Sequence, residues 1–315
     1  MKFRTNIQLQ KERNQLDYDS KIILFGSCFS EHIFNKLNYF KFNAVSNPFG
    51  ILFNPITIEK VITNSINEKR YTEKDIFYLN ERWHCFDAHS DLSSPDKNEL
   101  LQNLNNSIKS THKKLTEATH LIITLGTSWV YRFIEMDAIV GNCHKVPQKK
   151  FLKELLSVDE ITVSLENMIT LIKSVNASTN IIFTVSPIRH LKDGFVENSH
   201  SKAHLLAAIH QVTDNRNRLY YFPSYEIMMD DLRDYRFYNS DMIHPNNTAI
   251  SYIWEQFQQV WISEKSISIM KEIDTIQKGL AHKPFNPSSK QHQQFLKNLK
   301  DKIKVIQKQY PLISF

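Results

Sequence analysis

Glycine and cysteine are scarce in this sequence of 315 residues, and each scarcity excludes a class of protein. Six glycines are too few for a collagen-like or low-complexity chain. The three cysteines, Cys28, Cys85 and Cys143, are odd in number and no two have C-x-x-C spacing. A disulfide scaffold is therefore disfavoured, and a reducing compartment fits better. We expect a globular protein in the cytoplasm.

Long apolar runs are also missing. No stretch approaches the roughly 18–20 apolar residues that span a bilayer. The start, Met1 to Asn6, does not lead into the apolar segment of a signal peptide. These absences predict a soluble chain without a membrane span. The nucleotide-binding patterns G-x-x-x-x-G-K-[ST] and G-x-G-x-x-G do not occur either, and we predict no cofactor.

The charge balance is only mildly basic, with 39 Lys and Arg against 33 Asp and Glu, a net charge of +6. Much of the excess lies in residues 290–308. A basic helix there would suit nucleic acid or anionic lipid, but a solvated helix face is the commoner reason for such a run. We expect no nucleic-acid partner, and a steep salt dependence of affinity would identify one. The sequence does not indicate an oligomeric state.

Short, continuous apolar runs predict buried parallel strands, because strands covered on both faces lack polar alternation. These runs are residues 21–25, 120–125, 180–185 and 218–222. Helical patterns separate or follow them at residues 30–39, 98–116, 158–175, 198–213 and 246–262. Alternating strands and helices predict an α/β fold with a parallel sheet and helices on both faces. Ligands of such sheets bind beyond the carboxyl ends of the strands.

The predicted domain organisation has two parts. Residues 1–262 form an α/β domain, in which residues 40–97, with three prolines and many aromatic residues, are expected to be an insertion or cap over the site. Residues 263–315 are predicted to be a helical, basic C-terminal extension, broken at Pro284 and Pro287. No internal repeat is present.

The first candidate for chemistry is the segment Gly26-Ser27-Cys28-Phe29-Ser30, which follows the first predicted strand. A serine between a buried strand and a helix lies at the edge of the sheet, near a helix N-terminus that favours a developing oxyanion. Gly26 allows a tight backbone turn. Serine is also a preferred helix N-cap. The pentapeptide alone does not decide between a nucleophile and a cap.

The second candidate is the segment Asp241-Met242-Ile243-His244-Pro245. A serine hydroxyl becomes a good nucleophile when a base removes its proton, and histidine is the usual base. Asp241 precedes His244 by three residues, so in a tight loop its carboxylate can reach Nδ1 and fix the imidazole tautomer. Alone, a turn aspartate and a loop histidine would be the simpler interpretation. In this chain order after Ser27, the segment favours a catalytic pair.

The order of these motifs resembles that of the SGNH/GDSL hydrolase superfamily, and Gly26 to Ser30 is more narrowly similar to the GSCFA family within it. Further segments similar to that family, in its order, are residues 47–55, 125–130, 142–145 and 185–190. The resemblance covers roughly residues 3–260. It implies a three-layer α/β/α, flavodoxin-like fold and a Ser–Asp–His site acting on esters. The absence of G-x-S-x-G argues against the α/β-hydrolase fold.

Carried over by position, the resemblance implies that Ser27 is the nucleophile, His244 the base and Asp241 the residue that orients it. In the superfamily, a glycine N–H and an asparagine side chain complete the oxyanion hole. Gly50 stands in the place of that glycine, and the N–H of Ser27 is expected to be a further donor. The superfamily block G-x-N-D reads Gly126-Thr127-Ser128-Trp129 here, so a serine replaces the asparagine.

Three side chains are candidates for the missing oxyanion donor, namely Ser128, Asn47 and Asn142. Losing one such donor can cost about 10²–10³ in turnover. Arg189 and His190 follow the third strand and Trp129 follows the second, so we predict that they contact the substrate. For Arg189 and His190, a salt bridge to a neighbouring carboxylate is an equally good interpretation.

Other groupings of reactive side chains favour structural roles. Residues 83–89 hold two histidines, a cysteine and an aspartate, but structural zinc sites usually combine separated ligand pairs, and we predict no metal. Cys28, at a helix N-terminus, is an alternative nucleophile to Ser27. Only one of these neighbours can face His244, and the resemblance favours Ser27. Cys143 and His144 are adjacent, so their side chains diverge and a bracing role is expected.

The sequence thus predicts an esterase or O-acyltransferase with a small-molecule or carbohydrate ester as substrate. Acetyl esters of carbohydrates are suggested only by superfamily analogy. The alternative is a non-catalytic module that keeps the fold and binds a carbohydrate or ester, as the altered oxyanion block would allow. Saturable sugar binding without turnover would distinguish that alternative.

Overall fold

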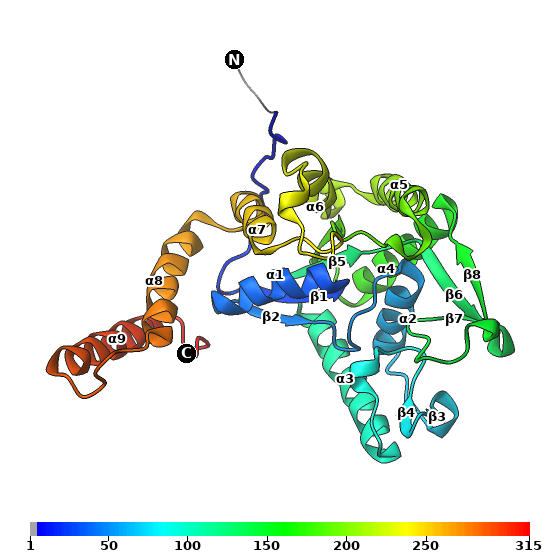
Figure 1. The fold of residues 1–315 in the computed structure, drawn as a ribbon, viewed down its shortest axis with the longest axis horizontal. Coiled ribbons are helices and arrows are strands. Elements are labelled where there is room, and N and C mark those ends of the chain that lie inside the picture. The colour runs from blue at the N-terminus through cyan, green and yellow to red at the C-terminus, as the bar shows by residue number, and fades with distance from the viewer. Residues whose placement is uncertain (1–4) are drawn as a thin grey trace.

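A twisted parallel sheet lies at the centre of the computed structural model, which describes residues 5–315 (Figure 1). Within this range five strands form the sheet, and every neighbouring pair is parallel. The strands are β1 (Lys21–Gly26), β2 (Asn43–Ser46), β5 (His120–Leu125), β9 (Asn180–Val185) and β10 (Leu219–Tyr221). The predicted strands coincide with β5 and β9, differ from β1 by one residue at its end, and differ from β10 by one residue at each end.

The strand order across the sheet is β10-β9-β5-β1-β2. Numbered along the chain, these strands have the order 2-1-3-4-5, which is the flavodoxin-like arrangement. The order reverses between β1 and β5, and a switch point of this kind opens a crevice at the carboxyl ends of the two strands. The structure therefore confirms the predicted α/β/α fold and places Ser27, which follows β1, at that crevice.

Helices cover both faces of the sheet. Those on one face are α1 (Cys28–Tyr39) and α7 (Asn247–Trp261), and those on the other are α2 (Pro55–Ile66), α3 (Lys97–Glu117), α4 (Val158–Val175) and α5 (Phe195–Val212). Successive strand residues point to opposite faces. Accordingly, Ile22 and Leu24 pack in the core under α1 and α7, whereas Ile23 and Phe25 pack in the other core. This two-sided burial explains the unbroken apolar sequence of the strands.

Residues 40–97, expected as an insertion or cap, contribute partly to the main layers. Their first half supplies β2 at the sheet edge and α2, which packs on α4, because Ile58, Val61 and Ile62 bury an apolar helix face. The part that stands outside the sheet is the antiparallel hairpin of β3 (Phe77–Leu79) and β4 (Arg82–His84).

A second small sheet was not predicted. It is antiparallel, has the order β7-β6-β8, and consists of β6 (Trp129–Phe133), β7 (Ala138–Val140) and β8 (Phe151–Leu155). It follows β5 directly in the chain. In Figure 1 it lies on the side of the molecule away from the C-terminal helices.

The C-terminal helices form an arm that extends from the α/β body (Figure 1). They are α8 (Glu264–Ala281) and α9 (Lys290–Gln309), and the predicted break at Pro284 and Pro287 separates them. Before the arm, α6 (Ser224–Glu226) continues into a π-helical turn (Ile227–Asp231). Of the helices in residues 5–315, none is long and apolar enough to cross a membrane.

Candidate active site

Ser27 occupies the turn between β1 and α1. It is the N-cap of α1, its Oγ accepts a hydrogen bond of 3.3 Å from the N–H of Phe29, and only 2% of the residue is exposed. The turn requires glycine at position 26, where φ is 142° and a Cβ would collide with the carbonyl of Thr124. The capping role that the sequence left open is therefore present, at the crevice between β1 and β5.

Asp241 and His244 form a hydrogen-bonded pair. The Nδ1 of His244 lies 2.7 Å from Oδ2 of Asp241, and Oδ1 of Asp241 accepts the N–H groups of Ile243 and His244. These two backbone N–H groups, followed by the imidazole, lower the pKa of Asp241 to about 2. The turn is tight because Met242 has a φ of 56°. The carboxylate thus stays ionised and fixes one orientation of the imidazole.

The Asp241–His244 loop lies at the carboxyl edge of the sheet. The N–H of Arg189, which follows β9, donates to the carbonyl of Ile243 at 3.3 Å. Burial lowers the pKa of His32 in α1, and the electrostatic influence of His244 lowers it further. In residues 5–315, no hydrogen bond joins Ser27 Oγ to His244; the nucleophile–base contact stays a prediction.

A cavity of about 290 Å³ lies beyond the end of β5, and we call it the edge cavity. Its lining includes Phe53, Asn54, Trp129, Asn142, Lys153 and His190. Trp129 and His190 line this cavity, whereas Ser27, Asp241 and His244 do not, and substrate contact by Trp129 and His190 stays a prediction. Lys153 stacks on Trp129 at 4.8 Å and pairs with Asp193, so one wall combines an aromatic face with charge.

His190 is neutral and one of its nitrogens has no partner. Burial lowers the pKa of His190 to about 3, and the electrostatic influence of Lys202 and His244 contributes to this. Its Nε2 is buried without a hydrogen bond in the described structure, while its ring lies 5.4 Å from that of Phe53. Arg189 instead lies 4.2 Å from the ring of Tyr238 and does not line the edge cavity.

The predicted oxyanion donors differ in what they bind. The N–H of Ser27 donates to Thr124 O and that of Gly50 donates to Asn47 O. Asn47 is held at both ends of its amide, accepting from Gly26 N–H and donating to Glu31. These backbone and side-chain groups are therefore engaged in this structure, and their oxyanion role stays a prediction.

Ser128 and Asn142, the other two candidate donors, also differ in the hydrogen bonds that their side chains make. The hydroxyl of Ser128 is buried and donates to Ser201 of α5, so it fastens that helix instead of facing the edge cavity. Asn142 lines the cavity and accepts the N–H of His144 with its Oδ1. Its Nδ2 makes no hydrogen bond within residues 5–315, which leaves two N–H donors available.

Lys202 is a buried charged residue that the sequence did not reveal. It belongs to α5, is 1% exposed, and donates to the carbonyls of Gly126 and Ser186 at 2.7 Å each. These carbonyls follow β5 and β9, so the ammonium group ties two strand ends together beside the edge cavity. Burial lowers the pKa of Lys202 to about 7. Nothing in the local sequence distinguishes it from a solvated helical lysine.

The other reactive side chains have structural partners. His84 lies 2.7 Å from Ser93 Oγ, and His144 lies 2.7 Å from the carbonyl of Cys85. No group of three or more His, Cys, Asp or Glu side chains among the described residues could hold a metal ion. Burial raises the pKa of the Cys28 thiol, which is opposite to what a nucleophilic thiolate needs.

Comparison with protein families covers nearly the whole chain. A model described as the GSCFA family matches residues 21–257, and one described as the GSCFA domain protein, C-terminal domain, matches residues 273–315. The first match spans the sheet, Ser27, Asp241 and His244, and the second spans most of the C-terminal arm. No curated protein matches the chain. Because the first match alone covers well over half of the residues, the chain belongs to the GSCFA family.

Proposed function

We propose that this chain is a serine-dependent esterase or O-acyltransferase that uses Ser27, His244 and Asp241. The observation that carries the proposal is the 2.7 Å hydrogen bond between His244 and Asp241. An ionised carboxylate on Nδ1 leaves Nε2 as the proton acceptor of the imidazole, as a general base requires. The pair lies at the carboxyl edge of the sheet, which is also where Ser27 caps α1.

The reaction begins when Ser27 Oγ attacks the acyl carbonyl carbon and its proton passes to His244 Nε2. The resulting tetrahedral intermediate collapses, the ester C–O bond breaks, and the leaving alkoxide takes the proton from His244. Water or a second hydroxyl group then attacks the acyl-serine, with His244 again accepting the proton. The second tetrahedral intermediate collapses, the bond between Ser27 Oγ and the acyl carbon breaks, and His244 returns its proton to Oγ, which releases the acid or the new ester.

The oxyanion requires N–H donors that are not already bound. Asn142 meets this condition, because it lines the edge cavity and its Nδ2 has no hydrogen-bond partner in the described structure. The N–H of Ser27 becomes a second donor if substrate displaces its 3.2 Å contact with Thr124 O. Asn142 is therefore our favoured replacement for the superfamily asparagine.

The edge cavity favours an acylated carbohydrate over a simple aliphatic ester. Trp129 and Tyr131 present aromatic surfaces, and Lys153, Lys192 and Asp193 present polar groups on the same wall. Such a wall offers both apolar contact and hydrogen bonds, which a sugar ring with hydroxyl groups uses together. An acetyl ester on a sugar hydroxyl is the substrate that we propose.

A second candidate, a non-catalytic carbohydrate-binding module, is favoured by one observation. Ser27 Oγ accepts the N–H of Phe29, and the N–H groups of Ser27 and Gly50 are engaged with backbone carbonyls. This is how a capped helix without an oxyanion hole would look. The two candidates differ in turnover, so a covalent probe distinguishes them.

The test is labelling of the full chain with a fluorophosphonate, which reacts with activated serines. Wild type and Cys28→Ala are expected to label, whereas Ser27→Ala and His244→Ala are not, because the nucleophile or its base is missing. Hydrolysis of acetylated sugars should follow the same pattern, with His244→Ala reducing the rate about 10²–10⁴-fold. Folded wild type that neither labels nor hydrolyses, yet binds sugars saturably, would establish the binding module.

A further inference from the structure

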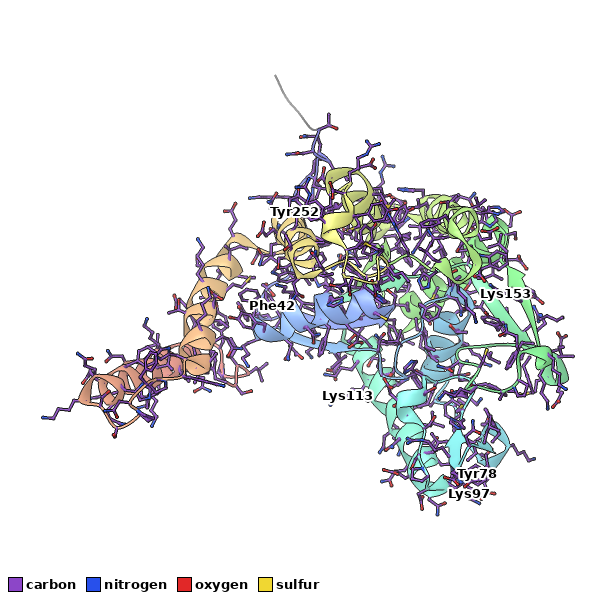
Figure 2. All side chains as sticks on the ribbon, viewed as in Figure 1. Phe42, Tyr78, Lys97, Lys113, Lys153 and Tyr252 are labelled. Carbon is purple, nitrogen blue, oxygen red and sulfur yellow. The ribbon has the colours of Figure 1, made fainter. Side chains whose placement is uncertain are left out.

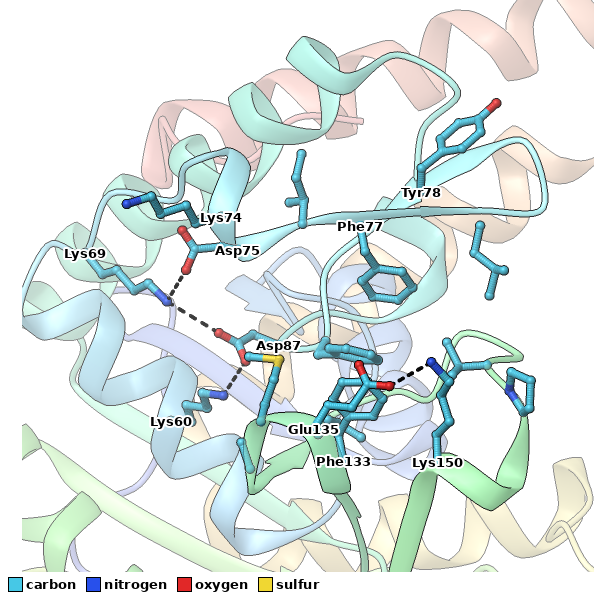
Figure 3. A pocket seen from close by; sticks show the side chains of 18 residues that line it. Lys60, Lys69, Lys74, Asp75, Phe77, Tyr78, Asp87, Phe133, Glu135 and Lys150 are labelled. Atoms are coloured by element: carbon cyan, nitrogen blue, oxygen red, sulfur yellow. Dashed lines mark hydrogen bonds and ion pairs between the residues drawn. The ribbon is translucent and has the colours of Figure 1, made fainter.

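A second and larger cavity, of about 480 Å³, lies between the β3–β4 hairpin and the β7-β6-β8 sheet (Figure 3). We call it the hairpin cavity; its wall includes Lys60, Lys69, Asp87, Phe77, Phe86 and Phe133. Like the edge cavity, it has no lining residue from the Ser27 or Asp241–His244 segments. Its volume is within the range of small-molecule sites, about 300–1,000 Å³. The function proposed above does not use this cavity.

One end of the hairpin cavity is polar, and its charged side chains already form ion pairs with one another. Asp87 is 6% exposed, and its oxygens meet Lys60 at 2.6 Å, Lys69 at 3.8 Å and the hydroxyl of Tyr71 at 3.1 Å. Lys69 also pairs with Asp75 at 2.9 Å (Figure 3). The buried carboxylate is thereby neutralised, and the half-exposed ammonium groups are what an entering ligand would meet.

The net charge of the lining is positive. Lys60, Lys69, Lys74 and Lys150 line the cavity against Asp75, Asp87 and Glu135, which is four positive charges minus three negative charges, or +1. Lys150 is paired with Glu135 at 2.8 Å. Lys74 is exposed and forms no ion pair within the described part of the chain. A ligand anion can therefore pair with Lys74 without displacing an existing carboxylate.

The other end of the cavity is mostly apolar, apart from the Lys150–Glu135 ion pair beside Phe133 (Figure 3). Three rings follow one another, with centroids 4.3 Å apart for Phe77 and Phe86 and 4.8 Å apart for Phe86 and Phe133. Ala138 and Val140 of β7 complete this wall. An apolar ligand body would find continuous aromatic and aliphatic surface here, and burial of its methylene groups would favour binding.

We propose that the hairpin cavity binds a small amphiphilic carboxylate, with its apolar body on the phenylalanine rings and its carboxylate at Lys74. A cationic amphiphile fits poorly, because the oxygens of Asp87 are occupied and the free charge is positive. A short carboxylate lacks the body that the apolar wall requires. The site is separated from the edge cavity by Val140, which lines both cavities.

The experiment is calorimetric titration of the full chain with octanoate, octylamine and butyrate. Octanoate should bind with a Kd of about 1 mM or tighter. The two other probes should bind at least about tenfold more weakly, since octylamine has the opposite charge and butyrate a shorter body. Absence of octanoate binding, or equal binding of octylamine, overturns the proposal.

Two variants locate the site, and one serves as a control. Ala138→Trp fills the apolar end, and Lys74→Glu reverses the free charge; each should weaken octanoate binding at least about tenfold. The control is Lys113→Glu, which changes an exposed lysine near the C-terminal end of α3, away from Tyr78 of the hairpin (Figure 2). This variant should bind octanoate as wild type does. If Ala138→Trp does not fold, as circular dichroism would show, Lys74→Glu decides. Equal weakening by both lysine variants would reveal surface binding and overturn the proposal.

Discussion

At the scale of single residues, the carboxylate of Asp241 does two separable things. Its Oδ1 accepts the N–H groups of Ile243 and His244 and so shapes the turn. Its Oδ2 accepts the proton of His244 Nδ1 and so selects the tautomer. An asparagine side chain can replace the first oxygen but not the second, because its NH₂ group donates where the carboxylate accepts.

Asp241→Asn should therefore preserve the fold and remove activity. Under the proposed function, ester turnover falls by about 10⁴-fold, since the imidazole presents the wrong nitrogen to Ser27. Turnover of an acetyl ester and the rate of fluorophosphonate labelling measure this. Asp234→Asn is the matched control, because Asp234 also caps a local turn and pairs with Arg236, but does not contact His244. Equal activity of both variants would show that Asp241 only shapes the loop.

The contact between Asp241 and His244 could be predicted from the sequence, because the two partners are close in the chain. Asp241 and His244 are three residues apart, so a tight loop suffices to bring them together. The partners of Ser128 and Asn47 could not be predicted in this way. Ser128 binds Ser201 of α5, 73 positions later, and Asn47 binds Glu31 of α1 across the sheet edge. Only the packing of whole elements determines such contacts.

At the scale of elements, apolar runs predicted the buried strands well and missed the exposed ones. Every residue of β5 and β9 is buried, so both sequences are continuously apolar or neutral. In β6 and β8 most residues are only half-buried, and Arg132 pairs with Glu154 across the two strands. Such short, mixed strands lack a run or a clear alternation.

In helix α5 the hydrophobic pattern does not predict the burial of Lys202, because a lysine on a helix is normally exposed to solvent. An unfolded lysine has a pKa of about 10.4, whereas burial lowers the pKa of Lys202 to about 7. Between these values the unfolded chain binds the proton and the folded chain does not. The folded state therefore becomes more stable as pH rises from about 7 to 10. Below about pH 7 Lys202 is protonated in both states, and its unfavourable contribution to the free energy of unfolding is at its largest and constant.

Lys202→Met should remove this pH dependence. The free energy of unfolding of wild type relative to the variant should rise between pH 7 and 10, at up to about 1.4 kcal/mol per pH unit for one proton. Urea unfolding at several pH values measures it, with the exposed Lys113→Met as a control that should follow wild type. A constant difference from pH 6 to 10 would mean that Lys202 keeps its charge in the folded chain.

At the scale of the whole molecule, the C-terminal arm and the candidate site occupy opposite ends of the sheet. The chain returns from α9 to the body at Tyr310 and Ile313, and Tyr310 contacts Tyr18 at a centroid distance of 5.1 Å. Tyr18 precedes β1 and Phe42 precedes β2, so both mark the amino ends of the strands. Ser27 and the edge cavity lie at the carboxyl ends. The arm thus covers apolar surface at the end that the site does not use.

Two neighbouring residues allow a test of whether the arm contributes to stability without affecting the candidate site. Ile313 is 4% exposed and lines the same pocket as Tyr18 and Phe42, whereas Leu312 is 84% exposed. Ile313→Asp places a charge in an apolar contact, so the chain end undocks and the free energy of unfolding falls by about 1–3 kcal/mol. Leu312→Asp should change it by less than about 0.5 kcal/mol. The rate of fluorophosphonate labelling should be the same in both variants and in wild type, because neither change reaches Ser27. Slower labelling of folded Ile313→Asp alone would show that the arm supports the site.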